Sequence, residues 1–312
     1  MSTDLLLYLG MFLGSLIVLL KSSDIFVDSA EKIGLSFGIS PFIVGVTIVA
    51  FGTSLPELAA SIAAVFAGDS EIVINSVVGS NIANVLLILG ITAVIAKEIR
   101  LDFNIIDVDI PFMVGTSLYL WFACWDLKIT WFETILFLLF LLLFLINSFN
   151  RDEEPDNSER PKTDWKTYGL MILGGVFIYL SANFTIEAIQ GIALIGGISP
   201  GVIALTLVAF GTSLPEVAVS VAAARKGKTG IAVGNVMGSN IFNIVAVMGI
   251  SRLFGDLVIP ADVLTFSLPF MFAVTIFFTL LGIGRNISRW EGIMLLLFYV
   301  YFVGQIYENA LV

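Results

Sequence analysis

The chain has 312 residues, of which 58% are hydrophobic and 13% charged, and its mean hydropathy is +1.01. Soluble globular domains have about 45–50% apolar and about 25% charged residues, so this composition excludes a soluble protein and predicts a membrane protein. Histidine is absent from the sequence, which excludes imidazole proton relays and the usual zinc ligand sets. The net charge of -10 and the single cysteine, Cys124, carry no functional information by themselves.

Ten apolar stretches are long enough to cross a bilayer, which takes about 20 apolar residues. They fill almost the whole chain, so we expect no separate soluble domain and predict an all-α polytopic membrane protein. In chain order the predicted spans are residues 5–30, 41–66, 72–95, 105–124, 130–149, 167–190, 200–224, 231–251, 262–283 and 290–308.

A polar, charged segment that contains proline, residues 150–166, falls at the middle of the chain. Its composition is typical of a solvated linker. It predicts a division into a first five-helix unit, residues 1–149, and a second, residues 167–312.

The basic residues of the loops divide unevenly between the two sides of the membrane. Twelve fall on the side of the linker and only two, Lys128 and Arg252, on the other. Cytoplasmic loops carry an excess of Lys and Arg. We therefore expect the linker to be cytoplasmic and both termini to be extracytoplasmic.

The two halves repeat each other at a shift of 159 residues. The sequence VAFGTSLPE occupies residues 49–57 and again 208–216, and GSNIAN at 79–84 matches GSNIFN at 238–243. Over the 52 positions that begin at Ile39, 26 are identical. Because each half has five spans, the second copy enters the membrane from the opposite face, which is the inverted repeat of many secondary transporters. A duplication kept for packing alone is the alternative, but packing would not preserve a nine-residue identity that includes a glutamate.

The repeated GTSLP segment predicts that the second and seventh spans break at mid-membrane, because proline removes a backbone hydrogen bond and glycine loosens the turn. Such a break frees carbonyl oxygens, which is tolerated only where the backbone lines a cavity or meets a ligand. Hydroxyl and carboxylate side chains stand beside both breaks: Thr53, Ser54, Glu57, Thr212, Ser213 and Glu216. Hard cations such as Ca2+ and Na+ prefer oxygen ligands of this kind.

The two glutamates strengthen this interpretation. A bare carboxylate at the bilayer centre costs at least about 2.5–3.5 kcal/mol, and the spans offer no Lys or Arg able to pair with Glu57 or Glu216. We therefore expect the neutralising ion to come from outside the protein. For either glutamate alone, a protonated side chain that is hydrogen-bonded to a neighbouring helix is the alternative.

The next span of each half carries Ser and Asn four residues apart, so that both lie on one face of a helix. These pairs are Ser80 with Asn84 and Ser239 with Asn243. They are candidates for further ion ligands, and interhelical hydrogen bonding without ion contact is the alternative. Asn81 and Asn240 are one residue off this face, and we expect them to be structural.

A GTSLPE span followed by a GSNxxN span, given twice in opposite halves of a ten-span protein, resembles the alpha repeats of the Na+/Ca2+ exchangers, in the cation/Ca2+ antiporter superfamily. The motifs cover residues 39–91 and 198–250, and the short linker is similar to that of prokaryotic members without a regulatory domain. The resemblance implies a Na+/Ca2+ antiporter in a prokaryotic inner membrane, which is not an enzyme. It implies a protein that lies in the lipid bilayer and binds Ca2+ and Na+, with no cofactor, no nucleic acid and no obligate protein partner.

The resemblance also implies ion ligands. Ca2+ would bind centrally to Glu57, Glu216 and the backbone carbonyls of Thr53 and Thr212. Na+ would share the glutamates and add two flanking sites. The flanks would comprise the Ala50 carbonyl, Ser54 and Ser239 on one side, and the Ala209 carbonyl, Ser213 and Ser80 on the other. Asn84 and Asn243 would line the middle position. Access would alternate as the first and sixth helices, residues 5–33 and 167–192, slide past the other eight.

One position departs from the family pattern. Many prokaryotic exchangers and the K+-dependent branch resemble one another in having aspartate where this chain has Asn243. The centre then holds two carboxylates, whose charge one Ca2+ balances, while three Na+ would leave one positive charge. With the three-to-one ratio that the resemblance implies, exchange is expected to be electrogenic, and the missing acid argues against K+ co-transport.

Other functions stay open. A Ca2+/H+ antiporter could use the same two glutamates as proton carriers, although it would not require the flanking serines. A cation channel is less favoured, because an inverted repeat within one chain is more typical of carriers. An intramembrane enzyme is weaker still, because no second nucleophile or cofactor motif accompanies the two carboxylates.

Overall fold

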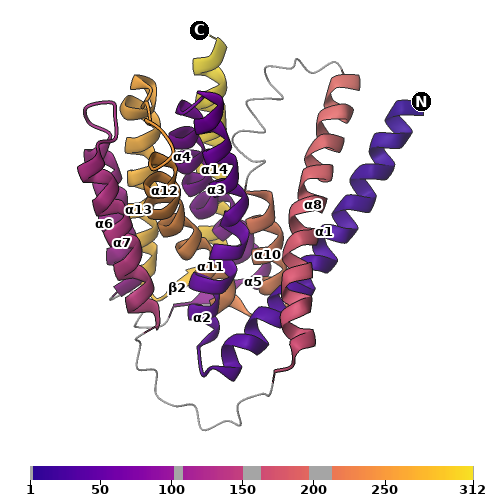
Figure 1. Ribbon diagram of the computed structural model, residues 1–312. Helices are drawn as coiled ribbons and strands as arrows, with labels where there is room; N and C mark the ends of the chain where they lie inside the picture. Colours follow the sequence, from indigo (N-terminus) through magenta and orange to yellow (C-terminus); the bar gives the residue numbers. More distant parts are fainter. Residues whose placement is uncertain (1–2, 102–107, 150–162, 197–212, 312) are drawn as a thin grey trace.

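The computed structural model describes residues 3–101, 108–149, 163–196 and 213–311, which form an almost entirely helical molecule (Figure 1). The first half contains α1 (Thr3–Ser36), α2 (Pro41–Val44), η1 (Gly45–Val49), α3 (Ala50–Ala67), α4 (Glu71–Ala83), η2 (Asn84–Ile88), α5 (Leu89–Ala96), β1 (Glu98–Arg100), α6 (Ile110–Ala123) and α7 (Trp131–Phe149). The second half contains α8 (Trp165–Ile195), α10 (Leu214–Arg225), α11 (Thr229–Phe242), η4 (Asn243–Val247), α12 (Met248–Arg252), η5 (Val263–Ser267), α13 (Leu268–Ile283), β2 (Asn286–Ser288) and α14 (Arg289–Leu311). The η segments are π-helical turns.

Eight of the described helical segments are long and apolar enough to cross a membrane, judged by length and composition. They coincide with eight of the ten predicted spans. The span predicted at 105–124 corresponds to the shorter apolar helix α6, and of the span predicted at 200–224 the structure describes α10. Most of the predicted linker lies outside the described residues, so the division into two units stays a prediction.

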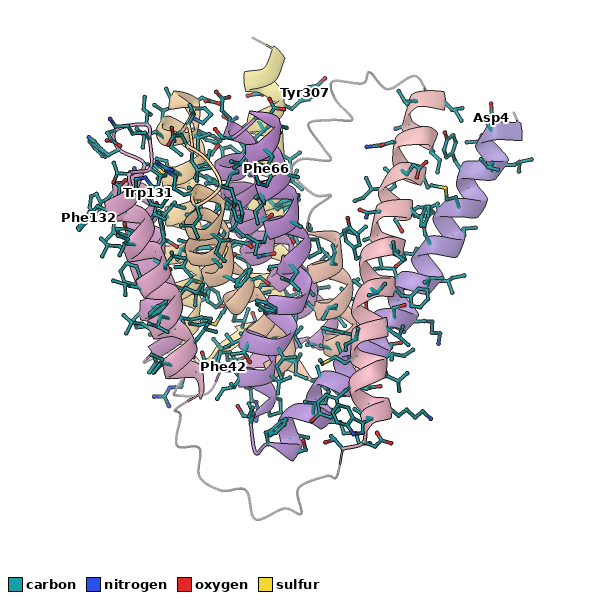
Figure 2. All side chains as sticks on the ribbon, viewed as in Figure 1. Asp4, Phe42, Phe66, Trp131, Phe132 and Tyr307 are labelled. Carbon is teal, nitrogen blue, oxygen red and sulfur yellow. The ribbon has the colours of Figure 1, made fainter. Side chains whose placement is uncertain are left out.

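The outer helices present apolar side chains to their surroundings, as a lipid-facing surface requires. Leu7, Leu143, Ile172 and Leu297 are each more than half exposed. Figure 2 shows such side chains along the outer helices, with Trp131 toward the end of the molecule that also holds Asp4 and Tyr307. By contrast, the most apolar window of the segment formed by α11, η4 and α12 is entirely buried within the bundle. The molecule is therefore an integral membrane protein with α11 at its centre.

Helices α1 and α8 lie side by side over much of their length (Figure 1). The Thr185 hydroxyl donates a hydrogen bond to Ser15 across this contact, at 2.8 Å. Gly191 lies directly against the ring of Tyr8, and small residues of this kind let membrane helices approach closely. The two helices thus form a packed pair beside the other helices.

A contact between the two halves occurs twice, formed the second time by the residues that the shift of 159 residues makes equivalent. In the β1–β2 pair, Ile99 lies opposite Ile287. The shifted counterparts of these residues, Val258 and Lys128, form an antiparallel bridge of their own. Strand β2 lies toward one end of the molecule in Figure 1, and Trp131, close to Lys128 in sequence, lies toward the other in Figure 2. An inverted repeat places equivalent contacts at opposite ends in this way.

The expected break of the second span differs from what the structure shows. The chain stays helical over Pro41–Ala67, with Pro56 inside α3. Proline removes only one backbone hydrogen bond, and the helix continues through the motif. In the second copy, α10 begins at Leu214 with Pro215 in its first turn. Residues 197–212 lie outside the described residues, so the break expected in the seventh span stays a prediction.

Candidate ion-binding site

Helix α11 packs against η1 and α3 at the centre of the bundle. The approach depends on Gly238, because a Cβ atom there would fall on the carbonyl oxygen of Val46 and lie 2.7 Å from the Cβ of Ala50. A glycine at this position therefore brings the polar residues of α11 against the turn that contains Ala50.

The two predicted glutamates are both buried in this region. Glu57 on α3 is 3% exposed and Glu216 on α10 is 2% exposed. The Ser54 hydroxyl donates a hydrogen bond to Glu216 Oε1 at 3.2 Å, so a side chain of the first copy contacts the carboxylate of the second. Among the described residues, neither glutamate forms an ion pair with Lys or Arg. Buried charges are normally paired or bind a metal.

Oxygen atoms with unused hydrogen-bonding capacity concentrate at these positions. Of the buried side-chain oxygens that find no hydrogen-bond partner among the described residues, six belong to the candidate positions, and others lie elsewhere in the bundle. The six are Glu57 Oε1 and Oε2, Glu216 Oε2, Asn84 Oδ1, Asn243 Oδ1 and Ser239 Oγ. Leaving a buried polar atom unsatisfied costs about 1–3 kcal/mol. A bound cation would satisfy such oxygens together, which makes this set a candidate ion-binding site.

The two site asparagines are held by a symmetric network. Asn84 Nδ2 donates to Asn240 Oδ1 at 3.2 Å, and Asn243 Nδ2 donates to Asn81 Oδ1 at 3.3 Å. These contacts turn the Oδ1 atoms of Asn84 and Asn243 away from the network. Asn81 and Asn240 therefore orient the candidate ligands, which agrees with the structural role expected for them.

Each site asparagine also begins a π-helical turn, η2 at Asn84 and η4 at Asn243. Single π-helical turns within α-helices are frequently found at functional sites. The two turns occupy equivalent positions in the two copies, and the sequence pattern did not predict them.

The other candidates that the structure describes are buried as well: Ala50, Thr53, Ser80 and Ser213. Ala209 and Thr212 lie outside the described residues, so their assignment stays a prediction. The described residues contain no group of three or more His, Cys, Asp or Glu side chains that could hold a metal ion. A cation would here be held by two carboxylates together with hydroxyl, amide and carbonyl oxygens, a ligand set that suits Ca2+.

Sequence reasoning missed one polar residue of this region, Asn235. It is fully buried on α11, its Oδ1 accepts a hydrogen bond from Thr53 at 3.2 Å, and its Nδ2 donates one to Ser220 at 2.9 Å. The available signal was its spacing, because Asn235 precedes Ser239 by four residues and so extends the same helix face.

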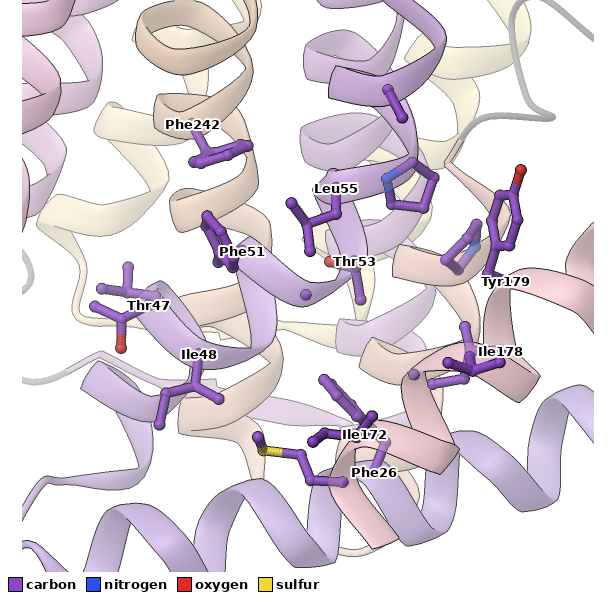
Figure 3. Close-up of a pocket in the computed structure, with 18 of the residues that line it drawn as sticks. Phe26, Thr47, Ile48, Phe51, Thr53, Leu55, Ile172, Ile178, Tyr179 and Phe242 are labelled. Carbon is purple, nitrogen blue, oxygen red and sulfur yellow. The ribbon is translucent and has the colours of Figure 1, made fainter. Parts of the chain in front are cut away.

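A cavity of about 900 Å3 lies between α8 and the helices that carry the site (Figure 3). Thr53, Pro56 and Pro215 line it on the side of the site, and Gly175 and Tyr179 line it on the side of α8. Most of its wall is apolar. Within the part of the chain that the structure describes, open space therefore separates α8 from this side of the site.

Comparisons with known proteins agree with this picture. A family model described as sodium/calcium exchanger protein matches residues 7–150 and 166–307. The sodium/calcium exchanger MaX1 of Methanosarcina acetivorans is 36% identical, over 95% of this chain and 97% of its own. The inner membrane protein YrbG of Escherichia coli is 32% identical, over 94% of each chain.

The fold is similar to a solved structure of the sodium-calcium exchanger NCX_Mj soaked with 100 mM Na+ and 10 mM Sr2+. The TM-score is 0.84 at 32% identity, and the match covers 96% of this chain and 98% of that chain. The family resemblance expected from the repeated motifs is thereby confirmed. This chain belongs to the sodium/calcium exchanger family of membrane transport proteins.

Proposed function

We propose that this protein exchanges Na+ for Ca2+ across the membrane by alternating access. The observation that carries the proposal is the pair of buried glutamates, Glu57 and Glu216, in equivalent positions of the two copies. Three of their four oxygens have no hydrogen-bond partner among the described residues. A divalent cation compensates two carboxylates without any basic side chain, and several Na+ ions can do the same when Ca2+ leaves.

In this proposal Ca2+ binds at the centre, to both glutamates and to the backbone carbonyls of Thr53 and Thr212. Na+ uses the glutamates and two flanking sites. The first flank consists of the Ala50 carbonyl, Ser54 and Ser239, and the second of the Ala209 carbonyl, Ser213 and Ser80. Asn84 and Asn243 line the middle position. The hydrogen bond from Ser54 to Glu216 supports this arrangement because it brings a flanking hydroxyl to a central carboxylate.

The charge count makes the exchange electrogenic and independent of K+. Two carboxylates balance one Ca2+, and three Na+ at the same site leave one positive charge. Asn243 supports this count because it is a neutral amide whose Nδ2 donates a hydrogen bond to Asn81, a contact that a carboxylate could not make as a donor. The site then lacks a third acid to hold an additional monovalent cation.

Alternating access occurs by movement of the α1–α8 pair past the other helices. Two observations support this step: the close contact of α1 with α8 and the cavity that separates part of α8 from the site (Figure 3). The linker between the two five-helix units is cytoplasmic in this account, with both termini on the extracytoplasmic side of a prokaryotic inner membrane.

Substitution of the glutamates tests the proposal. Glu57→Gln and Glu216→Gln keep the side-chain shape and remove the charge, and we expect each to abolish Na+-driven Ca2+ uptake by proteoliposomes without changing elution on size exclusion. Glu71→Gln is the matched control, because Glu71 is exposed at the start of α4. Unchanged uptake in both variants would refute the site. Uptake by the unsubstituted protein that follows a pH gradient and ignores Na+ would identify a Ca2+/H+ antiporter instead.

A further inference from the structure

We propose that Asn235 is a positioning residue that raises the Na+ affinity of the flank formed by the Ala50 carbonyl, Ser54 and Ser239. The inference rests on the proposed function. Asn235 is 0% exposed, and the equivalent position of the first copy holds Ser76, which has a shorter side chain. The two flanks of the site are therefore not chemically equivalent.

Three contacts fix the orientation of the Asn235 amide. Nδ2 donates to the Ser220 hydroxyl at 2.9 Å and lies 3.5 Å from the Glu216 backbone carbonyl. Because a backbone carbonyl can only accept, the nitrogen faces Glu216 and the oxygen faces the first copy. There the Thr53 hydroxyl donates to Oδ1 at 3.2 Å. Asn235 thus joins the backbone beside one glutamate to a threonine of the opposite copy.

Besides the Glu216 side chain, with which it also interacts, the Thr53 hydroxyl has three acceptors within reach for its one proton. They are Asn235 Oδ1 at 3.2 Å, the Val49 carbonyl at 3.2 Å and the Ala50 carbonyl at 3.3 Å. A threonine in a helix otherwise donates to the carbonyl three or four residues before it. While Asn235 accepts the proton, the lone pairs of the Ala50 carbonyl stay available to a cation. Without Asn235, Thr53 returns the proton to its own helix and weakens Ala50 as a ligand.

This arrangement affects Na+ more than Ca2+. The Ala50 carbonyl belongs to a Na+ flank, whereas central Ca2+ uses the glutamates and the threonine carbonyls. Loss of the Asn235 acceptor therefore raises the Na+ concentration needed for half-maximal exchange. The Ca2+ concentration needed for half-maximal exchange stays the same. A general loss of packing would change both values, or the maximal rate alone.

The test is a Na+ titration of Ca2+ transport by Asn235→Ser in proteoliposomes. Because a hydrogen bond contributes about 0.5–1.5 kcal/mol and 1.4 kcal/mol is tenfold, we expect half-saturation by Na+ to rise by roughly 2- to 10-fold. The Ca2+ value should not change. Asn75→Ser is the matched control, because Asn75 is exposed on α4 and donates only within its own helix, to the Glu71 carbonyl at 3.0 Å.

A double-mutant comparison isolates the route through Thr53. In a Thr53→Val background the hydroxyl is absent, so Asn235→Ser should cause no further rise in the Na+ value. Ser220→Ala removes an anchor of the amide and should cause a smaller rise than Asn235→Ser, which gives a second readout if Asn235→Ser folds poorly.

Specific outcomes would overturn the proposal. An unchanged Na+ value in Asn235→Ser and Ser220→Ala, an equal rise for Na+ and Ca2+, or an undiminished effect in the Thr53→Val background would each show that Asn235 does not act in this way. Na+/Ca2+ exchange would still stand in those cases. Absence of Na+-driven uptake in the unsubstituted protein would instead refute the proposed function itself.

Discussion

Two lysines in the turn between α10 and α11 hold the end of α1 by ion pairs. Lys226 lies 2.7 Å from Asp28, and Lys228 lies 2.6 Å from Asp28 and 2.7 Å from Glu31. Partial burial by itself lowers the pKa of Lys228, but its bonds to the two carboxylates raise that pKa above its ordinary value. The ammonium group therefore stays charged at neutral pH and loses its charge only when the pH rises above the raised pKa.

If the α1–α8 pair moves during transport, these ion pairs must break or change partners in each cycle. The groups are partly exposed, with 27% and 19% of the two lysine side chains accessible, so each pair contributes about 0.2–1 kcal/mol. The three short pairs and a longer contact of Lys226 with Asp24 at 3.5 Å share partners. We therefore assign the cluster about 1–2 kcal/mol, which corresponds to a factor of about 5–30 in a two-state ratio.

The double substitution Lys226→Gln and Lys228→Gln removes both ammonium groups. We expect it to shift the equilibrium between the two positions of the α1–α8 pair by a factor of about 5–30, away from the arrangement in which α1 contacts the α10–α11 turn. Spin labels are attached to the substitutions Trp165→Cys on α8 and Trp290→Cys on α14, in a Cys124→Ala background. Double electron–electron resonance between them reports the distance of the α1–α8 pair from the other helices. Both tryptophans are strongly exposed, so labels there should not disturb packing.

Salt gives the same test without a mutation. The Debye length shortens from about 10 Å at 0.1 M salt to about 3 Å at 1 M, so added salt weakens exposed ion pairs. A non-transported salt such as choline chloride should therefore shift the distance distribution of the parent protein toward that of the double variant. The double variant itself should respond little. Identical distance distributions for the two proteins at low salt would refute the argument that this cluster holds α1 in place.

Three further predictions concern the site and its selectivity. Asn243→Asp should cost the hydrogen bond to Asn81 and add a titratable group, so Ca2+ flux should vary more steeply with pH; an unchanged pH profile would count against a central position for residue 243. Gly238→Ala should force α11 away from the Val46 carbonyl, lowering stability by about 1–3 kcal/mol and reducing uptake, as measured by thermal unfolding and Na+-driven flux; a variant as stable and active as the parent would contradict the close contact. Replacing external and internal K+ by choline should leave the exchange rate unchanged, whereas a dependence on K+ would overturn the two-carboxylate charge count.

Hydropathy and the internal repeat carried most of what could be read from the sequence. Apolar segments of about 20 residues have few alternatives to crossing a bilayer, and eight of the predicted spans correspond to long apolar helices. The repeat also located the two glutamates, because a buried acid duplicated within a nine-residue identity is hard to explain by packing. Both side chains are buried as expected.

Features that depend on contacts between the copies were not predictable in the same way. The acceptor role of Asn235 toward Thr53 requires α11 to lie against α3, and no local pattern specifies that contact. The π-helical turns at Asn84 and Asn243 likewise have no established sequence signature here. The prediction of a helix break at Pro56 was wrong, because α3 continues through Pro56 despite one missing hydrogen bond.

In the proposed exchange, Na+ and Ca2+ compete for one site of two carboxylates and move net charge. The most direct measurement is Ca2+ uptake by proteoliposomes loaded with Na+, at clamped membrane voltage, against vesicles loaded with K+ or choline and vesicles with an imposed pH gradient. We expect uptake that requires internal Na+ and accelerates when the interior is made positive. Uptake that follows the pH gradient and does not depend on Na+ would contradict it.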